Sequence, residues 1–190
     1  MRERIVEAAG AAFAERGYAG VHLGELAIGL GLARDRLMSF YPNKPLLARE
    51  VVGRHARNWE SLAGSELDPE GRLLDEIEAL TYRLAYSYQV DALAQGGTRL
   101  SAERPVVPGE LPRPALAWLL QRLSALLAEA QRRGEVKPCI DPPRVAGVIV
   151  AFFHGAHAVS QHPAVQQDLA GCLERFWAMA RPFLRVEAPT

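Results

Sequence analysis

Hydrophobic residues recur at helical spacing along almost the whole chain. Ile5, Ala8, Ala9, Ala12 and Phe13 stand at i, i+3, i+4, i+7 and i+8, the pattern of a helix that packs one face on a core. No stretch of alternating polar and apolar residues is long enough to indicate a strand. The pattern therefore predicts an all-α protein.

Glycine and proline divide this pattern into elements. A first helix ends at Gly17, and two short helices follow over about 23–30 and 33–40. Longer helices are predicted from the remaining stripes, at about 45–62, 73–88, 91–104, 116–127, 145–159 and 169–184. The segments 64–71, 105–114 and 134–143 are predicted to be connectors, and the second of these contains four prolines.

The composition is that of a globular protein with a real core. Apolar residues make up 49% of the 190 residues, and 22 basic residues balance 22 acidic ones. This balance argues against a generally cationic nucleic-acid coat. Residues 1–60 carry 9 basic and 7 acidic residues, hence +2, which leaves 13 and 15, hence −2, for the remainder. The asymmetry has the sign expected of a front end that touches DNA, but it is too small to establish one.

Cysteine content and hydropathy indicate a reduced, cytoplasmic chain. Cys139 and Cys172 are the two cysteines, too few for a disulfide framework. The longest apolar run, 145–153, is half the length of a membrane span, and Met1 leads directly into a charged amphipathic segment. We therefore expect no contact with a membrane.

Residues 23–41 carry the strongest local signal. A helix-turn-helix needs a small residue where its helices cross, a glycine in the turn and apolar positions that lock the helices together. Ala27 and Gly31 meet the first two requirements. The locking positions are Leu26, Leu30, Leu32, Leu37 and Phe40. An ordinary helical hairpin is the alternative interpretation of this pattern.

Two flanking motifs extend this signal. The segment 13–18, Phe-Ala-Glu-Arg-Gly-Tyr, and the segment 41–47, Tyr-Pro-Asn-Lys-Pro-Leu-Leu, together with the hairpin resemble the N-terminal signature of the TetR family of transcriptional repressors. The resemblance implies a three-helix DNA-binding domain over 1–44. It also implies a helical bundle over 45–190 that binds an effector and forms a homodimer through the last two helices.

Three later segments narrow the resemblance. Residues 95–104, 110–114 with Trp118, and 151–160 resemble the gamma-butyrolactone receptor branch of actinomycetes. Members of this branch leave operators upstream of antibiotic genes when a small lipophilic lactone, butenolide or furan binds. The resemblance covers most of the chain and is weakest over 61–90.

The predicted recognition helix departs from the family pattern. Ala33 replaces the hydroxyl residue that usually caps the helix and meets a phosphate, and Met38 replaces a phosphate-binding tyrosine. Asp35 adds a carboxylate, which favours the helix N-terminus but opposes a polyanion. His22 is a poor cap for the preceding helix. We therefore expect operator affinity to be weakened, altered or lost.

Some DNA contacts survive or have replacements. Arg34 keeps the family's positive charge, and Arg36 is placed to reach a phosphate or a guanine. Lys44 matches the family's phosphate-contacting lysine, Ser39 is a possible backbone donor, and Tyr41 has core packing as its stronger alternative. Arg2 and Arg4 are the basic residues expected to precede the first helix as a short arm.

The resemblance also implies an effector pocket with Trp118 on its wall, for which an ordinary core tryptophan is the alternative. Two ligand-binding tyrosines of relatives align with Ala56 and Ala115, which predicts a roomier and less polar pocket. Other candidates share only their position near this pocket, and each has a structural alternative: Arg83, Leu84, Thr98, Leu100, Ser101, Phe152 and His157.

No other chemistry is predicted. Of the five histidines, His22, His55, His154, His157 and His162, the pair at 154 and 157 shares a helix face, but neither has a cysteine or carboxylate at ligand spacing. No nucleophile elbow or phosphate loop occurs. We expect no catalytic residues, no metal and no cofactor.

Two functions remain. The first is a dimeric repressor that binds a pseudo-palindromic operator and is released by a small lipophilic signal. The second is a ligand-binding or partner-binding module that kept this fold, lost operator affinity and would act by pairing with a related repressor.

Overall fold

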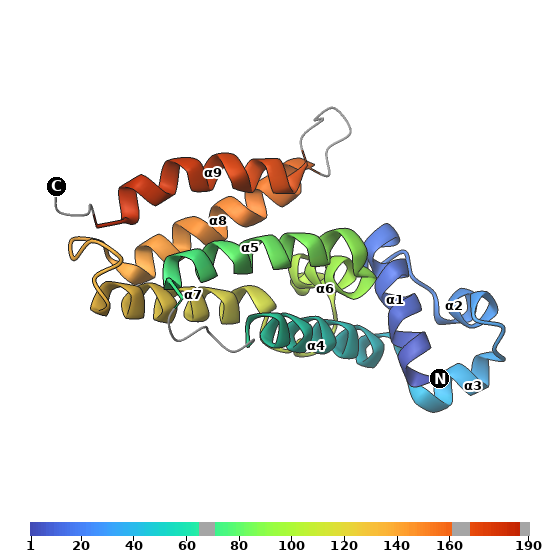
Figure 1. Cartoon of the computed structure of the whole chain (residues 1–190). Coiled ribbons are helices and arrows are strands. Elements are labelled where there is room, and N and C mark those ends of the chain that lie inside the picture. Colours follow the sequence, from blue (N-terminus) through green and yellow to red (C-terminus); the bar gives the residue numbers. More distant parts are fainter. Residues whose placement is uncertain (65–70, 161–167, 187–190) are drawn as a thin grey trace. The chain divides into compact units, whose positions relative to one another are not determined.

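The computed structural model describes residues 1–64, 71–160 and 168–186. Apart from an isolated antiparallel bridge between Val136 and Arg185, its regular structure is helical within those ranges, so the all-α prediction is confirmed. The elements in chain order (Figure 1) are α1 (Arg2–Arg16), α2 (Leu23–Gly29), α3 (Arg34–Phe40), α4 (Lys44–Ala63), α5 (Leu73–Val90), α6 (Ala92–Ala102), a 3-10 turn η1 (Arg104–Val106), α7 (Ala115–Arg132), α8 (Pro142–Ser160) and α9 (Leu169–Leu184).

The predicted helices are present, with two corrections. Helix α1 already begins at Arg2, so Arg2 and Arg4 lie in its first turn and form no separate arm. The helix expected to run to Arg104 ends at Ala102, since a short 3-10 turn takes over before the proline-rich connector. Most of the predicted connector 64–71 and all of 161–167, which contains His162, lie outside the described residues. No described helix is both long enough and apolar enough to cross a membrane.

Contacts group the chain into two compact units. Residues 1–60 and 87–115 form the first unit, and residues 61–86 and 116–190 form the second. Helix α6 therefore belongs with the helix-turn-helix, although more than 25 residues of the other unit separate them along the chain.

The first unit is built around α1. Its residues Ile5, Val6, Ala9 and Phe13 are buried and pack in one cluster with residues of α2, α3, α4 and α6. Leu37 from α3 is completely buried there, which fixes the face that α3 turns toward the core.

Helices α1 and α6 cross at two glycines. A Cβ atom added at Gly96 would lie 2.3 Å from the carbonyl oxygen and 2.9 Å from the Cα atom of Gly10. A Cβ atom added at Gly10 would lie 3.0 Å from the carbonyl oxygen of Ala92. Since the obstacles are backbone atoms, the approach of these two helices depends on the absence of side chains.

The second unit packs parts of α5, α7, α8 and α9 around an apolar core. Trp177 is 1% exposed, and its indole Nε1 donates to Thr81 Oγ1 at 2.9 Å. The buried Thr81 hydroxyl in turn donates to the Glu78 carbonyl oxygen at 2.7 Å. Each buried polar group of this pair is thus satisfied, as a packed core requires.

Candidate functional site

Helices α2 and α3 form the predicted hairpin. Gly31 has φ +68°, the left-handed conformation that glycine adopts without strain, and the Leu32 amide donates to the Ala27 carbonyl oxygen at 2.9 Å. Ala27 is 1% exposed at the crossing, and Leu26 and Leu37 lock the two helices from inside. The turn and the locking positions are therefore as predicted.

Both helices begin without a side-chain cap. His22 precedes α2 and Ala33 precedes α3, and neither side chain accepts a hydrogen bond from the helix. This confirms the expected loss of the caps, a deficit of about 1 kcal/mol for each helix relative to a hydroxyl residue. Packing on Leu26 and Leu37 has to hold these short helices instead.

The two arginines of α3 are available for a partner. Arg34 and Arg36 are exposed, and the Arg36 guanidinium carbon lies 5.1 Å from the centroid of the Phe40 ring. That ring restricts where the guanidinium can point. Ser39 is exposed as well, but its hydroxyl donates to the Arg36 carbonyl oxygen at 2.7 Å, so its proton is committed within the helix.

The other two predicted DNA contacts have internal partners. Lys44 Nζ donates to the Tyr18 carbonyl oxygen at 2.8 Å and lies 4.4 Å from the Tyr18 ring centroid. Tyr41 is 7% exposed, and burial is the main cause that raises its pKa. Core packing therefore accounts for Tyr41. A role for Lys44 at a phosphate stays a prediction that rests on its remaining donors.

A clamp from α6, formed by Arg99 and Glu103, holds the C-terminal end of α1. Arg99 Nη1 donates to the carbonyl oxygens of Ala14 and Glu15 at 2.7 and 2.8 Å, where the helix dipole is negative. Its Nε meets Glu103 Oε1 at 3.0 Å, and Glu103 Oε2 accepts the Tyr18 amide at 2.6 Å. Burial alone would raise the pKa of Glu103, but the Tyr18 amide and Arg99 together hold that pKa below its ordinary value.

Gly17 makes room for this clamp. Its φ is +69°, and a Cβ atom there would lie 2.5 Å from Glu103 Oε1. The motif over 13–18 thus places a glycine where α1 ends and where the carboxylate of Glu103, the residue after α6, approaches.

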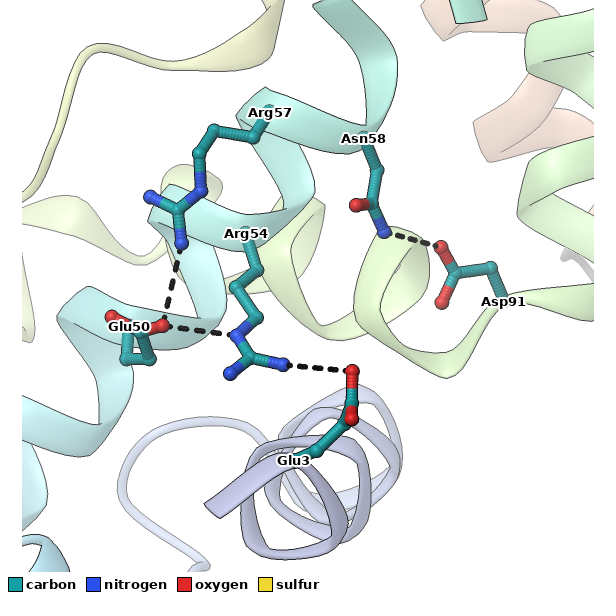
Figure 2. Close-up of polar contacts among 6 residues, drawn as sticks. All are labelled: Glu3, Glu50, Arg54, Arg57, Asn58 and Asp91. Carbon is teal, nitrogen blue, oxygen red and sulfur yellow. Dashed lines mark hydrogen bonds and ion pairs between the residues drawn. The ribbon is translucent and has the colours of Figure 1, made fainter. Parts of the chain in front are cut away.

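Polar contacts fasten α4 to its neighbours (Figure 2). Arg54 meets Glu50 at 2.9 Å and Glu3 of α1 at 3.7 Å, and Arg57 meets the same Glu50 oxygen at 3.3 Å. Beside them Asn58 reaches Asp91, the residue that caps α6. Exposed ion pairs of this kind add little stability. Their consequence is that Glu50 offsets part of the positive charge of two arginines of α4.

A buried polar network joins α4 to α6. His55 is 2% exposed, and its Nε2 lies 3.2 Å from Thr98 Oγ1, which also donates to the Tyr88 hydroxyl at 3.0 Å. Trp59 packs edge-on against the rings of His55 and Tyr88, and its indole Nε1 donates to Ser87 Oγ at 3.2 Å. A Cβ atom added at Gly97 would lie 2.5 Å from the His55 Cβ atom.

Three residues of α6 that are predicted to contact the effector already make contacts within the first unit. Thr98 belongs to the His55 network, and the Ser101 hydroxyl donates to the Gly97 carbonyl oxygen at 2.8 Å. Leu100 is completely buried in the core that also contains Phe13. Their effector contacts stay predictions, with these structural roles beside them.

The other predicted effector residues lie in the second unit. Trp118 is half-buried on α7, Leu84 is completely buried on α5, and Arg83 is paired with Glu76. On α8, Phe152 stacks on Phe176 with ring centroids 4.3 Å apart.

His154 and His157 are half-buried on the same helix. Burial lowers the pKa of both, and the neighbouring His157 charge lowers the pKa of His154 further. Across the described part of the chain, no group of three histidine, cysteine or carboxylate residues is arranged to hold a metal ion.

A cavity of about 570 Å³ lies in the second unit. Arg72, Asp75, Glu135, Arg181 and Arg185 supply its charged wall. Trp118 is not among its lining residues, and a wall of five charged groups does not suit a lipophilic effector.

Sequence reasoning missed the residues that organise the first unit. The sequence places Arg99, Glu103 and Gly96 only within a segment that resembles the gamma-butyrolactone receptors, and it offers His55 only as a possible metal ligand. A signal was present, since two adjacent glycines inside a helical pattern mark a close approach of another element. The partner of that approach cannot be read from the chain.

Comparisons with known proteins agree with the resemblance. No family model matches the chain. The A-factor receptor protein of Streptomyces griseus is 29% identical over 178 residues, which are 94% of this chain and 61% of that protein. The chain thus spans less than two thirds of the length of this relative.

Solved structures share the fold. A structure from work on the molecular basis for control of antibiotic production by bacterial hormones has a TM-score of 0.87 and 28% identity, and the match covers 97% of both chains. An ArpA-like gamma-butyrolactone receptor has a TM-score of 0.83 and 23% identity, with 97% of this chain and 87% of that chain covered. The latter identity supports the fold alone. Together the comparisons support the similarity to TetR-type gamma-butyrolactone receptors.

Proposed function

We propose that the protein is a ligand-responsive transcriptional repressor. It binds a pseudo-palindromic operator as a dimer, through α3 of residues 1–44, and a small lipophilic signal of the gamma-butyrolactone, butenolide or furan type releases it. The observation that carries the proposal is the hairpin of α2 and α3, in which Leu37 is buried while Arg34 and Arg36 are exposed. The similarity to the A-factor receptor supports the class of effector.

A dimer gives this hairpin its target geometry. Two recognition helices related by a two-fold axis reach half-sites about 34–36 Å apart, one turn of DNA. Exposed apolar residues support a homodimer through the last two helices: Val148 and Val159 on α8 are 60% and 45% exposed, and Met179 and Phe183 on α9 are 70% and 65% exposed. Trp177 is buried in the core of its own chain and is not part of this exposed apolar face.

The effector would act by preferring one of two spacings of the recognition helices. A ligand shifts such an equilibrium only by the difference between its affinities for the two states. Among residues 45–190, we assign Trp118 first to this ligand, because its side chain is half-buried and aromatic.

The proposal is tested by capture of sheared genomic DNA from the source organism at low and at physiological salt, followed by sequencing. A few palindromic fragments that survive physiological salt and dissociate when a panel of lactones, butenolides and furans is added are the expected result. Fragments that bind the protein but are not released by any of these compounds would refute the proposed class of effector alone.

A second function is favoured by the state of α3 and of the residues that follow it. The Ser39 proton is used within the helix, Tyr41 is buried, and Lys44 Nζ already binds the Tyr18 carbonyl oxygen. These commitments favour a cytoplasmic module of the same fold that has weak or no operator affinity and pairs with a related repressor. A folded, dimeric protein that captures no DNA in the same experiment would identify this alternative.

A further inference from the structure

The centre of the outward face of α3 carries a carboxylate. Residues of a helix are rotated by about 100° from one to the next. Leu37 is completely buried, so Asp35 and Ser39, each two positions away, point about 160–200° from the core. Arg36 lies beside them, about 100° from the Leu37 direction.

The charge of Asp35 is not neutralised by any part of the chain that the structure describes. The side chain is exposed, and no residue in the described ranges forms an ion pair or a hydrogen bond with it. Arg34 and Arg36 adjoin Asp35 along the chain, yet neither approaches it as an ion-pair partner within those ranges. An acceptor-only group is therefore presented at the middle of the surface that the proposed function places against DNA.

Phosphate oxygens repel such a group, whereas some base edges attract it. In the major groove, cytosine presents the N4 amino donor without a neighbouring ring acceptor, and adenine presents its N6 donor beside the N7 acceptor. A carboxylate is thus better suited to cytosine. The guanine paired with a cytosine presents the O6 and N7 acceptors that an arginine reads. Arg36 follows Asp35 directly, and the Phe40 ring 5.1 Å away restrains its guanidinium.

We propose that Asp35 is a specificity-determining residue, which accepts a hydrogen bond from N4 of a cytosine in each half-site while Arg36 donates to a guanine of the same or the adjacent pair. This inference rests on the proposed function. It names the base that the operator supplies and gives a role to a residue whose charge otherwise only weakens DNA binding.

The test begins with selection of double-stranded DNA from a random library by the full-length protein, followed by sequencing. The selected site is then compared with unrelated DNA, at one salt concentration, for the wild type, Asp35→Ala and Asp35→Asn. The quantity measured is the ratio of the two affinities, because loss of a negative charge raises both affinities. Glu110→Ala is the matched control, since it removes an exposed carboxylate from the connector before α7.

We expect the selected half-site to contain a cytosine–guanine pair at which Asp35→Ala lowers the affinity ratio at least about fivefold. Asp35→Asn should shift the preference at that pair toward adenine, the base that a side-chain amide reads. Glu110→Ala should leave the ratio unchanged. Circular dichroism of each variant checks that the helices are intact.

A modified base tests the contact itself. N4-methylcytosine carries a methyl group in place of the hydrogen that the groove exposes. At the assigned position it should weaken the wild type at least about fivefold and leave Asp35→Ala unaffected. The same modification at another cytosine of the site should have no such effect.

Two kinds of failure are distinguishable. A wild type that selects no sequence would refute the proposed function and this inference with it. A wild type that selects a site while Asp35→Ala keeps the same base preference, or binds all DNA tighter by one common factor, would overturn the inference alone.

Discussion

The crossing of α1 and α6 makes Gly96→Ala a sensitive perturbation. The added Cβ atom would meet the Gly10 carbonyl oxygen at 2.3 Å, while ordinary contact begins near 3.4 Å. The atoms nearest to this Cβ are main-chain atoms of Gly10, so no side chain can rotate away. The two helices must therefore move apart, which also stretches the contacts of Arg99 with the end of α1.

Two effects of opposite sign set the magnitude. Overpacking of a well-packed core costs about 1–3 kcal/mol. Alanine favours a helix interior over glycine by about 1 kcal/mol, which offsets part of that cost. We expect a net loss of about 1–2 kcal/mol in the free energy of unfolding, and a fall in Tm of roughly 2–8 °C.

Gly147→Ala is the matched control. It adds the same methyl group inside α8, where a Cβ atom would meet nothing within 4 Å. This variant should keep the propensity gain and be stabilised by up to about 1 kcal/mol. Urea denaturation followed by circular dichroism measures both variants. Equal or greater stability of Gly96→Ala than of the wild type would show that the reasoning about this crossing is wrong.

Three further predictions concern charge and the effector. Glu103→Gln should cost roughly 1 kcal/mol of stability at neutral pH. Because the pKa of Glu103 is lowered in the folded state, the stabilisation by its carboxylate is present above about pH 4.5 and is lost as the pH falls through the folded pKa. The urea midpoints of the wild type and of Glu103→Gln should therefore converge between pH 6 and pH 3. Trp118→Ala should reduce the response to effector at least about tenfold with operator affinity near that of the wild type, and a variant that fails to fold would identify Trp118 as a core residue. Burial lowers the pKa of His154 and His157 in the folded state, so the unfolded chain binds more protons than the folded chain as the pH falls through about 6.5, and Tm should fall from pH 7.5 to 5.5. Replacement of both histidines by glutamine should reduce this dependence of Tm on pH. An unchanged dependence would show that these two histidines are not its cause.

Local patterns predicted most of the fold. The stripe from Ile5 to Phe13, the glycines at 17 and 31 and the missing caps before α2 and α3 all depend on residues close in sequence, and each has the expected form. The structure corrects the start of α1, since Arg2 and Arg4 lie in its first turn. The effector contacts of Thr98, Leu100 and Ser101 stay predictions, and the structure adds contacts of these residues within the first unit.

The candidate site was less predictable because its partners are remote in the chain. Thr98 binds a histidine 43 positions earlier, and Arg99 binds carbonyl oxygens 84 and 85 positions earlier. Nothing local distinguishes a hydroxyl that faces an effector from one that satisfies a buried imidazole. The indole of Trp177 likewise has its partner, Thr81, 96 positions away along the chain.

The unit that contains the helix-turn-helix consists of two separate segments of the chain, 1–60 and 87–115. A hybrid repressor made by exchanging only an N-terminal segment between relatives would combine one protein's α1 with another protein's α6. Its glycine crossing and its arginine clamp would then come from sequences that were never selected together. Exchange of operator preference between relatives should accordingly succeed when residues 87–115 are exchanged together with the N-terminal segment. Recombination within the gene should be tolerated at the boundaries of these two segments.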